Sequence, residues 1–191
     1  MKKGIIVSGI IGMLCLVQQG VAADSDRSAD HNALRALRDK VETSLNTGNM
    51  QDLRTCLAKD FTFITSDQTV LTNWTDVVAY WDGMFKSDKS PVKTMKTKFT
   101  ADILTQFSGP DLGYCHGISR DVYTLRNDRK IAMINTWSSM LIKEQDGWKI
   151  SSAHVAVNFL DNPVLAAREL SWFGRLCVAL HLRKLPGEVK E

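Results

Sequence analysis

Alternation of polar and apolar residues over four long stretches in the second half of the chain constrains the fold more than any other feature. These stretches are Lys93–Phe107, Leu112–Leu125, Lys130–Lys143 and Trp148–Phe159. Asn127-Asp128 and Asp146-Gly147 lie between the last three and are typical of hairpin turns. A period of two residues interrupted by tight turns predicts a meander of long antiparallel strands with one buried face.

The first half of the chain has a helical period instead. Apolar residues recur three or four positions apart from Ala29 to Thr47, which predicts a helix that ends at Gly48. Asn49 and Asn73 each precede a further apolar stripe and have an aspartate three residues later, as at many helix starts. Three N-terminal helices and an antiparallel meander predict an α+β fold. We expect a cone-shaped, curved sheet that packs on these helices and encloses a cavity.

The N-terminus has the pattern of a signal peptide. Lys2 and Lys3 precede an apolar run, and Val21-Ala22-Ala23 provides small residues for cleavage after Ala23. The alternative is an uncleaved anchor helix, although the apolar run is shorter than the ~20 residues that span a bilayer. We therefore expect an exported, periplasmic protein with a signal peptide at 1–23, one domain at 24–160 and a C-terminal helical extension at 161–191.

The charge and cysteine content exclude several classes of function. Without Lys2 and Lys3 the chain has 22 basic and 21 acidic residues, a balance that argues against nucleic acid as the main partner. Cys56, Cys115 and Cys177 are too few and odd in number for a disulfide framework, so we expect free, buried thiols. Metal-ligand spacings and glycine-rich phosphate or dinucleotide motifs are missing from the sequence, so neither a metal nor a cofactor is expected.

Three titratable residues on the long strands are the candidates for catalysis. His154 shares a strand face with Trp148 and Ile150 by the period of two, and we expect it to point toward the helices with them. An imidazole there could serve as a general acid or base, the alternative being a core histidine bonded to a neighbour. His116 could meet His154 across adjacent strands, and Asp121 is an acid that caps no helix.

Aromatic and polar residues around the expected cavity are candidates for ligand binding. Arg120 inside the cone would favour an anionic or carbonyl-bearing ligand, whereas on the sheet surface it would pair with a neighbouring strand. Asp121 alternates with Arg120 and faces the opposite side unless a bulge intervenes. The aromatic residues could also be simple core. The expected ligand contacts are Tyr80, Trp81, Phe85, Tyr114, Arg120, Asn135 and Trp137.

The C-terminal extension has its own amphipathic pattern. Asn162-Pro163 predicts the start of a helix that runs from Val164 to Leu185 and has a wide apolar surface. Its apolar run is too short to span a bilayer, and basic residues outnumber acidic ones. This pattern suits peripheral contact of residues 164–185 with an anionic membrane surface, or packing on the cone or on a dimer mate.

Three segments in this order resemble the nuclear transport factor 2-like superfamily and, within it, the bacterial SnoaL-like branch. They are residues 49–61, 111–117 and 147–154, and the resemblance extends over about Ala29 to Phe159. It implies a conical, cystatin-like α+β roll with an internal pocket, and often a homodimer through the sheet. The superfamily includes ketosteroid isomerases, polyketide cyclases, dehydratases and non-catalytic binders, so the fold leaves the activity open. We expect a small, mostly apolar ligand without catalysis. The alternative is a lyase or isomerase that uses a pocket histidine with a second His or Asp.

Overall fold

A computed structural model describes residues 27–157 and 162–189 of the 191-residue chain. The predicted signal peptide and its cleavage site lie outside the described residues, as do Asn158 and Phe159 of the last expected strand. The elements of the described residues are α1 (Ser28–Thr47), α2 (Met50–Cys56), β1 (Leu57–Ile64), β2 (Val70–Leu71), α3 (Trp74–Phe85), β3 (Val92–Ala101), β4 (Gln106–Phe107), β5 (Leu112–Leu125), β6 (Lys130–Glu144), β7 (Gly147–Val157), α4 (Pro163–Arg168) and α5 (Trp172–Ala179). The fold is α+β, as predicted.

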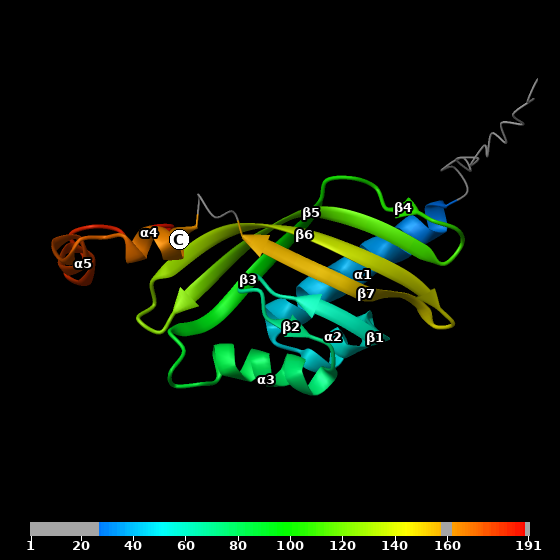
Figure 1. Cartoon of the computed structure of the whole chain (residues 1–191), viewed down its shortest axis with the longest axis horizontal. Helices are drawn as coiled ribbons and strands as arrows, with labels where there is room; N and C mark the ends of the chain where they lie inside the picture. Colours follow the sequence, from blue (N-terminus) through cyan, green and yellow to red (C-terminus); the bar gives the residue numbers. More distant parts are fainter. Residues whose placement is uncertain (1–26, 158–161, 190–191) are drawn as a thin grey trace, which may run out of the picture.

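The strands form one curved, open sheet in the order β2-β1-β7-β6-β5-β3, with β4 beside β5. The meander predicted from the alternating pattern is the series β3, β5, β6 and β7, in which each pair is antiparallel. The stretch expected as one strand from Lys93 to Phe107 is divided into β3 and β4. β1 runs parallel to β7. Figure 1 shows α1, α2 and α3 gathered on one side of the curved sheet.

Local sequence rules account for the positions of the helices. The side chain of Asn49 accepts a hydrogen bond from the Asp52 amide at 3.2 Å, and Asn73 accepts one from the Asp76 amide at 3.0 Å. Each bond satisfies an amide at a helix start that has no partner within the helix. α1 ends at Gly48, whose φ of 72° lies in the left-handed region that glycine adopts without a steric penalty. Side-chain caps therefore mark the starts of α2 and α3, and a glycine marks the end of α1.

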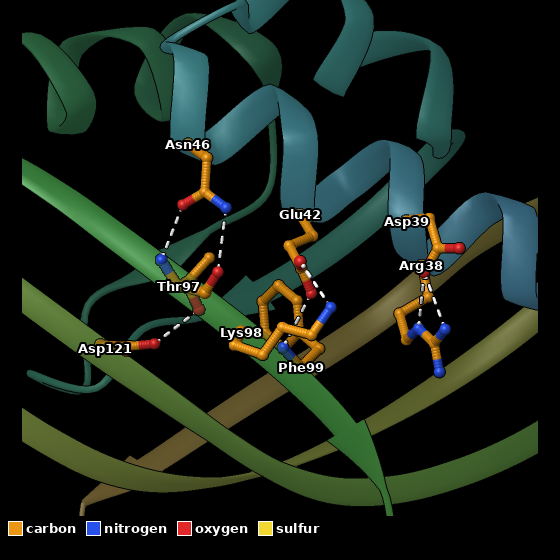
Figure 2. A network of polar contacts seen from close by, with 8 residues as sticks. All are labelled: Arg38, Asp39, Glu42, Asn46, Thr97, Lys98, Phe99 and Asp121. Atoms are coloured by element: carbon orange, nitrogen blue, oxygen red, sulfur yellow. Dashed lines mark hydrogen bonds and ion pairs between the residues drawn. The ribbon is translucent and has the colours of Figure 1, made fainter.

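Polar side chains of α1 attach this helix to β3, the last strand of the sheet (Figure 2). The side chain of Asn46 accepts from the Thr97 amide at 2.7 Å and donates to the Thr97 carbonyl at 2.9 Å. Glu42 accepts from the Phe99 amide at 3.0 Å. An edge strand otherwise exposes backbone groups that can pair with other chains. These bonds cover that edge and set the distance between helix and sheet.

Buried apolar side chains form two clusters instead of one continuous core. One contains Leu57, Phe61, Leu71 and Val77, where β1 and β2 meet α3. The other contains Leu34, Leu141 and Trp148, where α1 crosses β6 and β7. The indole of Trp148 also donates to the Asp30 carboxylate at 2.8 Å. The clusters hold the helices against the sheet around a space that side chains do not fill.

The C-terminal extension differs from the single helix expected over Val164–Leu185. It forms the two short helices α4 and α5, which Figure 1 shows at one end of the molecule, away from α1–α3. The Ser171 side chain accepts from the Gly174 amide at 3.1 Å and starts a new helix. α5 stops before His181, whose φ is 58°. The apolar periodicity does not predict the break between α4 and α5, because a serine cap does not interrupt an apolar stripe.

Candidate functional site

A cavity of about 290 Å³ lies between the helices and the inner face of the sheet. The apolar stripes of α1 and α3 line one side, and alternate residues of β3, β5, β6 and β7 line the other. Residues of the sheet that reach the cavity include Cys115, Ser119, Trp137, Ala153 and Val155. Most of the wall is carbon, which suits an apolar ligand.

The structure separates the predicted ligand contacts into two groups. Tyr80, Trp81, Phe85 and Trp137 line the cavity. Asn135 is only 1% exposed and lies behind the wall, where it bonds Asp121. Tyr114 and Arg120 are exposed on the outer face of the sheet. The expectation that these two residues contact a ligand inside the cone is therefore corrected, because β5 directs Cys115 and Asp121 inward and its alternate residues outward.

Asp121 is the centre of a polar cluster in this otherwise apolar wall. It is 7% exposed. Its Oδ1 accepts from the Thr97 hydroxyl at 2.6 Å, and its Oδ2 accepts from the Asn135 amide at 2.6 Å. Tyr123, two residues further along β5, is a further hydrogen-bond partner and also lines the cavity. The cluster joins β3, β5 and β6 at one place on the inner face.

Burial controls the protonation of this cluster. Loss of solvent raises the pKa of Asp121 above its usual range, although hydrogen bonds from Thr97, Ser119 and Asn135 oppose the rise. Burial and the nearby charge of Asp121 raise the pKa of Tyr123 as well. A carboxyl group with a raised pKa can take up or release a proton closer to neutral pH than an exposed aspartate can. Asp121 is thus the cavity group best suited to exchange a proton or hydrogen bond with a ligand.

A second polar group borders the cavity near α3. Thr65 and Tyr80 line the wall, and the Thr65 hydroxyl donates to the Asp67 carboxylate. Burial favours the protonated form of Asp67, but hydrogen bonds from Thr65 and Thr69 outweigh it and lower its pKa. Burial raises the pKa of Tyr80. Asp67 is therefore an ionised turn residue and Tyr80 a neutral hydroxyl beside it.

His154 lies on the face of β7 opposite to the one expected. Leu141 pairs with Ile150 and Met140 pairs with Ser152, so Ser151 is an extra residue in the strand. Such a bulge reverses the alternation. Ile150 faces the cavity before the bulge, and Ala153 and Val155 face it afterwards. The inward orientation of His154 is therefore corrected, and the structure gives it no contact with the cone.

His116 and His154 instead border a shallow depression on the outer face. They are not on adjacent strands, since both pair with Ser138 of β6 from opposite sides. The Nδ1 atom of His116 lies 3.4 Å from the Asp102 carboxylate, whereas the Nε2 atom of His154 is buried without a hydrogen-bond partner. Asp121 does not face this depression, so the three predicted catalytic residues do not form one site.

His31 and Cys115 line the cavity and were not identified from the sequence. His31 lies three residues before Leu34 on the inner stripe of α1, and this spacing was the available signal. It precedes Asn46, the residue nearest to the Asp121 cluster, by 15 positions or ~22 Å of helix. His31 and Asp121 are thus at opposite ends and cannot act as a pair. Burial raises the pKa of Cys115 to about 11, which keeps it a protonated and weakly nucleophilic thiol.

Among residues 27–157 and 162–189, no group of three or more His, Cys, Asp or Glu side chains could hold a metal ion. In the same part of the chain, Cys56, Cys115 and Cys177 are free. The polar side chains that line the cavity include Asp121, Tyr123, Tyr80 and His31, and the indole of Trp137 has a buried Nε1 without a hydrogen-bond partner.

Solved structures with the same fold include both enzymes and proteins of unknown function. A hexachlorocyclohexane dehydrochlorinase from Novosphingobium barchaimii superposes with a TM-score of 0.60 at 14% identity, over 72% of this chain and 92% of that chain. A proposed dehydratase of the nuclear transport factor 2-like family from Streptomyces avermitilis gives 0.58 at 12% identity, over 69% and 98%. A cystatin-like domain of unknown function from Nostoc punctiforme gives 0.55 at 18% identity, over 81% and 95%.

At these identities the likeness establishes the fold alone. No curated protein sequence matches the chain. The family model of the SnoaL-like domain, however, matches residues 34–159. This match spans α1 to β7, the elements that enclose the cavity, and the chain therefore belongs to the SnoaL-like domain family.

Proposed function

We propose that the cone binds a small, mostly apolar molecule that carries one oxygen or nitrogen function, without converting it. The observation that supports this proposal is the cavity itself, about 290 Å³ in volume, with mostly apolar walls and polar groups at Asp121 and at Thr65 and Tyr80. Small-molecule sites typically combine an apolar lining with a few placed polar groups. The volume suits a compact ligand.

The polar groups of the wall suggest how such a molecule is oriented. Tyr123 lines the cavity beside Asp121, and its hydroxyl can donate to or accept from a ligand. Asp121 in its protonated form can donate, and in its ionised form can accept. A carbonyl or hydroxyl group attached to an apolar ring or chain matches both residues.

The test uses an uncharged aromatic probe, N-phenyl-1-naphthylamine, whose fluorescence rises in apolar surroundings. Ala153→Phe places a ring in the cavity from β7, and we expect loss of most probe binding because the space is filled. The matched control is Ser152→Phe, one residue earlier on the outer face. Native mass spectrometry of the purified protein would reveal a ligand that co-purifies. Equal probe binding by both variants would reject the cone as the binding site.

The alternative function is that of a lyase or isomerase that transfers a proton to or from the bound molecule. One observation favours it: Asp121 has a raised pKa, lines an apolar cavity and hydrogen-bonds Tyr123. An acid and a second titratable group in one cavity are the minimum for such chemistry. Asp121→Asn preserves the shape of the side chain and removes the titration. Turnover of a co-purified ligand that this variant abolishes while it still binds the ligand would establish catalysis.

Export of the protein is a proposal that depends on the N-terminal sequence pattern. The basic start, the short apolar run and the small residues before Asp24 support cleavage after Ala23. We expect the protein to act in the periplasm. Mass spectrometry of the protein recovered from the periplasmic fraction should give an N-terminus at Asp24, and an intact residue 1 in that fraction would refute the cleavage.

Homodimer formation through the sheet is a further proposal. Tyr114, Ile134 and Met140 are exposed on the outer face of β5 and β6, on the side away from the cavity. Large apolar side chains gathered on one face of a sheet are typical of an interface. A second copy related by two-fold symmetry would cover the same residues on both protomers.

A further inference from the structure

Residues 162–189 are attached to one end of the sheet by their own last residues. The Ala132 amide donates to the Gly187 carbonyl at 2.9 Å, and the Val189 amide donates to the Lys130 carbonyl at 3.1 Å. The tail thus continues the sheet for a short distance along the start of β6. α4 and α5 are thereby attached to the domain at a defined place.

Arg129 holds α5 in position from the end of the β5–β6 hairpin. Its side chain is only 9% exposed. It donates to the Val178 carbonyl at the end of α5 at 2.8 Å and forms an ion pair with Glu188 of the tail. The arginine lowers the pKa of Glu188, so this acid is ionised and neutralised in place. The orientation of α5 is therefore fixed by buried polar contacts.

On α5 the large apolar side chains are exposed, which is the reverse of their usual position on a surface helix. Gly174 and Val178 are buried, Gly174 against Leu170 and Ser171, and Val178 at the carbonyl that Arg129 bonds. The opposite side carries four large apolar residues, all exposed: Trp172, Phe173, Leu176 and Leu180. At 100° per residue these four lie within about 100° of one another. Trp172 is 77% exposed and Leu182, in the turn that follows, is 76% exposed.

Basic residues surround this apolar face. Arg175 is exposed on the flank of α5, Arg168 precedes the helix, and Arg183 and Lys184 follow it. The acids of the described extension are Glu169 and Glu188, and the second is already paired with Arg129. The guanidinium of Arg175 donates to the carbonyls of Leu170 and Arg168, which keeps its charge beside the apolar residues. The surface therefore combines exposed carbon with unneutralised positive charge.

We propose that α5 and the turn after it, residues 172–184, rest on the surface of an anionic lipid bilayer. Tryptophan and phenylalanine favour the boundary between headgroups and acyl chains, and lysine and arginine favour anionic headgroups. The α5 axis would lie in the plane of the membrane, with Arg175, Arg183 and Lys184 at the level of the phosphates. None of the helices in the described ranges is long and apolar enough to cross a membrane.

The charge around the apolar face distinguishes a lipid from other occupants. The body of the same protomer does not cover this face, since Trp172, Phe173, Leu176 and Leu180 are all exposed within the protomer. A second copy would bring its own Arg175, Arg183 and Lys184 against the same charges and be repelled. An anionic bilayer instead provides an apolar layer beneath a sheet of negative charge, which is the complement of this surface.

The first test measures co-flotation of the chain from Asp24 to Glu191, which contains every described residue. The vesicles are phosphatidylcholine alone, or phosphatidylcholine with one part in four of phosphatidylglycerol. We expect binding to the anionic vesicles, a blue shift of tryptophan emission and a decrease at high salt. Trp172→Gln with Leu176→Gln should reduce binding at least tenfold. Val70→Gln is the control, since Val70 is 57% exposed but lies on β2.

A second variant tests the charges and preserves the apolar face. Each basic residue at an anionic surface contributes roughly fivefold to the partition coefficient, so Arg183→Gln with Lys184→Gln should reduce binding roughly twenty- to thirtyfold. Binding to phosphatidylcholine alone should change little. Circular dichroism and thermal unfolding confirm that both double variants fold.

Two results would overturn the proposal. One is failure of the wild-type chain to bind anionic vesicles at low salt. The other is self-association of the wild type without vesicles that Trp172→Gln with Leu176→Gln abolishes, which would make this face a protein interface. Probe binding in the cone should be the same for all these variants, so the result is independent of the proposed ligand site.

Discussion

At the residue scale, Asp121 illustrates how packing changes the chemistry of a common side chain. The carboxyl group is held by Thr97 and Asn135 on neighbouring strands and is separated from solvent by the cavity wall. Desolvation disfavours its charged form more than the hydrogen bonds from Thr97, Ser119, Asn135 and Tyr123 favour it, so the pKa rises. Asp67, whose hydrogen bonds from Thr65 and Thr69 outweigh burial, shifts in the opposite direction. The two acids therefore make opposite contributions to stability as the pH changes.

Replacement of Asp121 by Asn should alter the pH dependence of stability in a defined direction. Because the folded-state pKa is raised, the contribution of Asp121 is fully present below the unfolded pKa of about 3.9 and is lost as the pH rises through the folded pKa. Asn does not titrate, and the Oδ1 atom of Asn135, which has no partner, can accept from its amide after rotation of that side chain. The free energy of unfolding of Asp121→Asn relative to wild type should therefore increase from about pH 4 to pH 7.

Urea unfolding of both proteins at each pH measures this difference directly. Asp67→Asn is the matched control with the opposite sign, because its lowered pKa gives stability that is present above the unfolded pKa and lost as the pH falls. That variant should be most destabilised near pH 7. A difference for Asp121→Asn that stays constant or decreases toward pH 7 would contradict the raised pKa.

At the element scale, the sequence predicts what depends on local rules and misses what depends on pairing. Helix caps at Asn49 and Asn73 and the alternating pattern of β5 are local signals, and they place these elements within a residue or two. The parallel pairing of β1 with β7 joins residues about ninety positions apart and leaves no local mark. The extra residue Ser151 likewise becomes visible only against the partner strand β6.

The candidate site shows what is lost when strand pairing is not visible in the sequence. The aromatic residues of α3 and Trp137 were placed in the cavity wall by period alone, and the structure puts them there. His154 was assigned to the wrong face because one bulge reverses every side chain that follows it. The link between α1 and β3 through Asn46 was also missed, because an asparagine near a helix end gives no indication of a partner fifty residues away.

The contact between α1 and β3 gives a prediction at this scale. Asn46→Ala removes both bonds to the Thr97 backbone and leaves its amide without a partner. The expected loss is about 1–3 kcal/mol of unfolding free energy, the usual cost of an unsatisfied buried group. Hydrogen exchange at the Thr97 amide should accelerate more than exchange in the centre of β6.

Lys98→Ala is the control for that substitution. It removes the ion pair with Glu42, but the lysine side chain is 68% exposed, so the loss should be below about 1 kcal/mol. If Asn46→Ala were as mild as Lys98→Ala in thermal unfolding, the edge of β3 would be held by other contacts.

At the scale of the whole molecule, the curved sheet divides the protein into surfaces for which different roles are proposed. Its inner face carries the cavity and the Asp121 cluster, its outer face carries Tyr114, Ile134 and Met140, and the C-terminal extension projects from one end (Figure 1). These three surfaces share few residues, so ligand binding, dimer formation and membrane contact can each be disrupted separately. Each proposed role can therefore be tested with variants on its own surface.

Dimer formation through the outer face is tested by placing a charge at its centre. Met140→Glu introduces a carboxylate on β6 opposite Tyr114, and a two-fold interface would bury it twice, without a partner. The expected cost is about 2 kcal/mol or more per protomer, which corresponds to a dissociation constant raised several hundredfold or more. Analytical ultracentrifugation should show twice the protomer mass for the wild type and the protomer mass for the variant at the same concentration.

Two further variants locate the interface. Val70→Glu carries the same charge at an exposed position on β2 and should remain dimeric. Trp172→Gln with Leu176→Gln should also remain dimeric, because α5 lies outside the proposed interface. A wild-type chain that sediments as a protomer at every concentration, or a Met140→Glu chain that remains a dimer, would remove the outer face from consideration. In the second case the edge of β3 or the exposed face of α5 would become the surface to test.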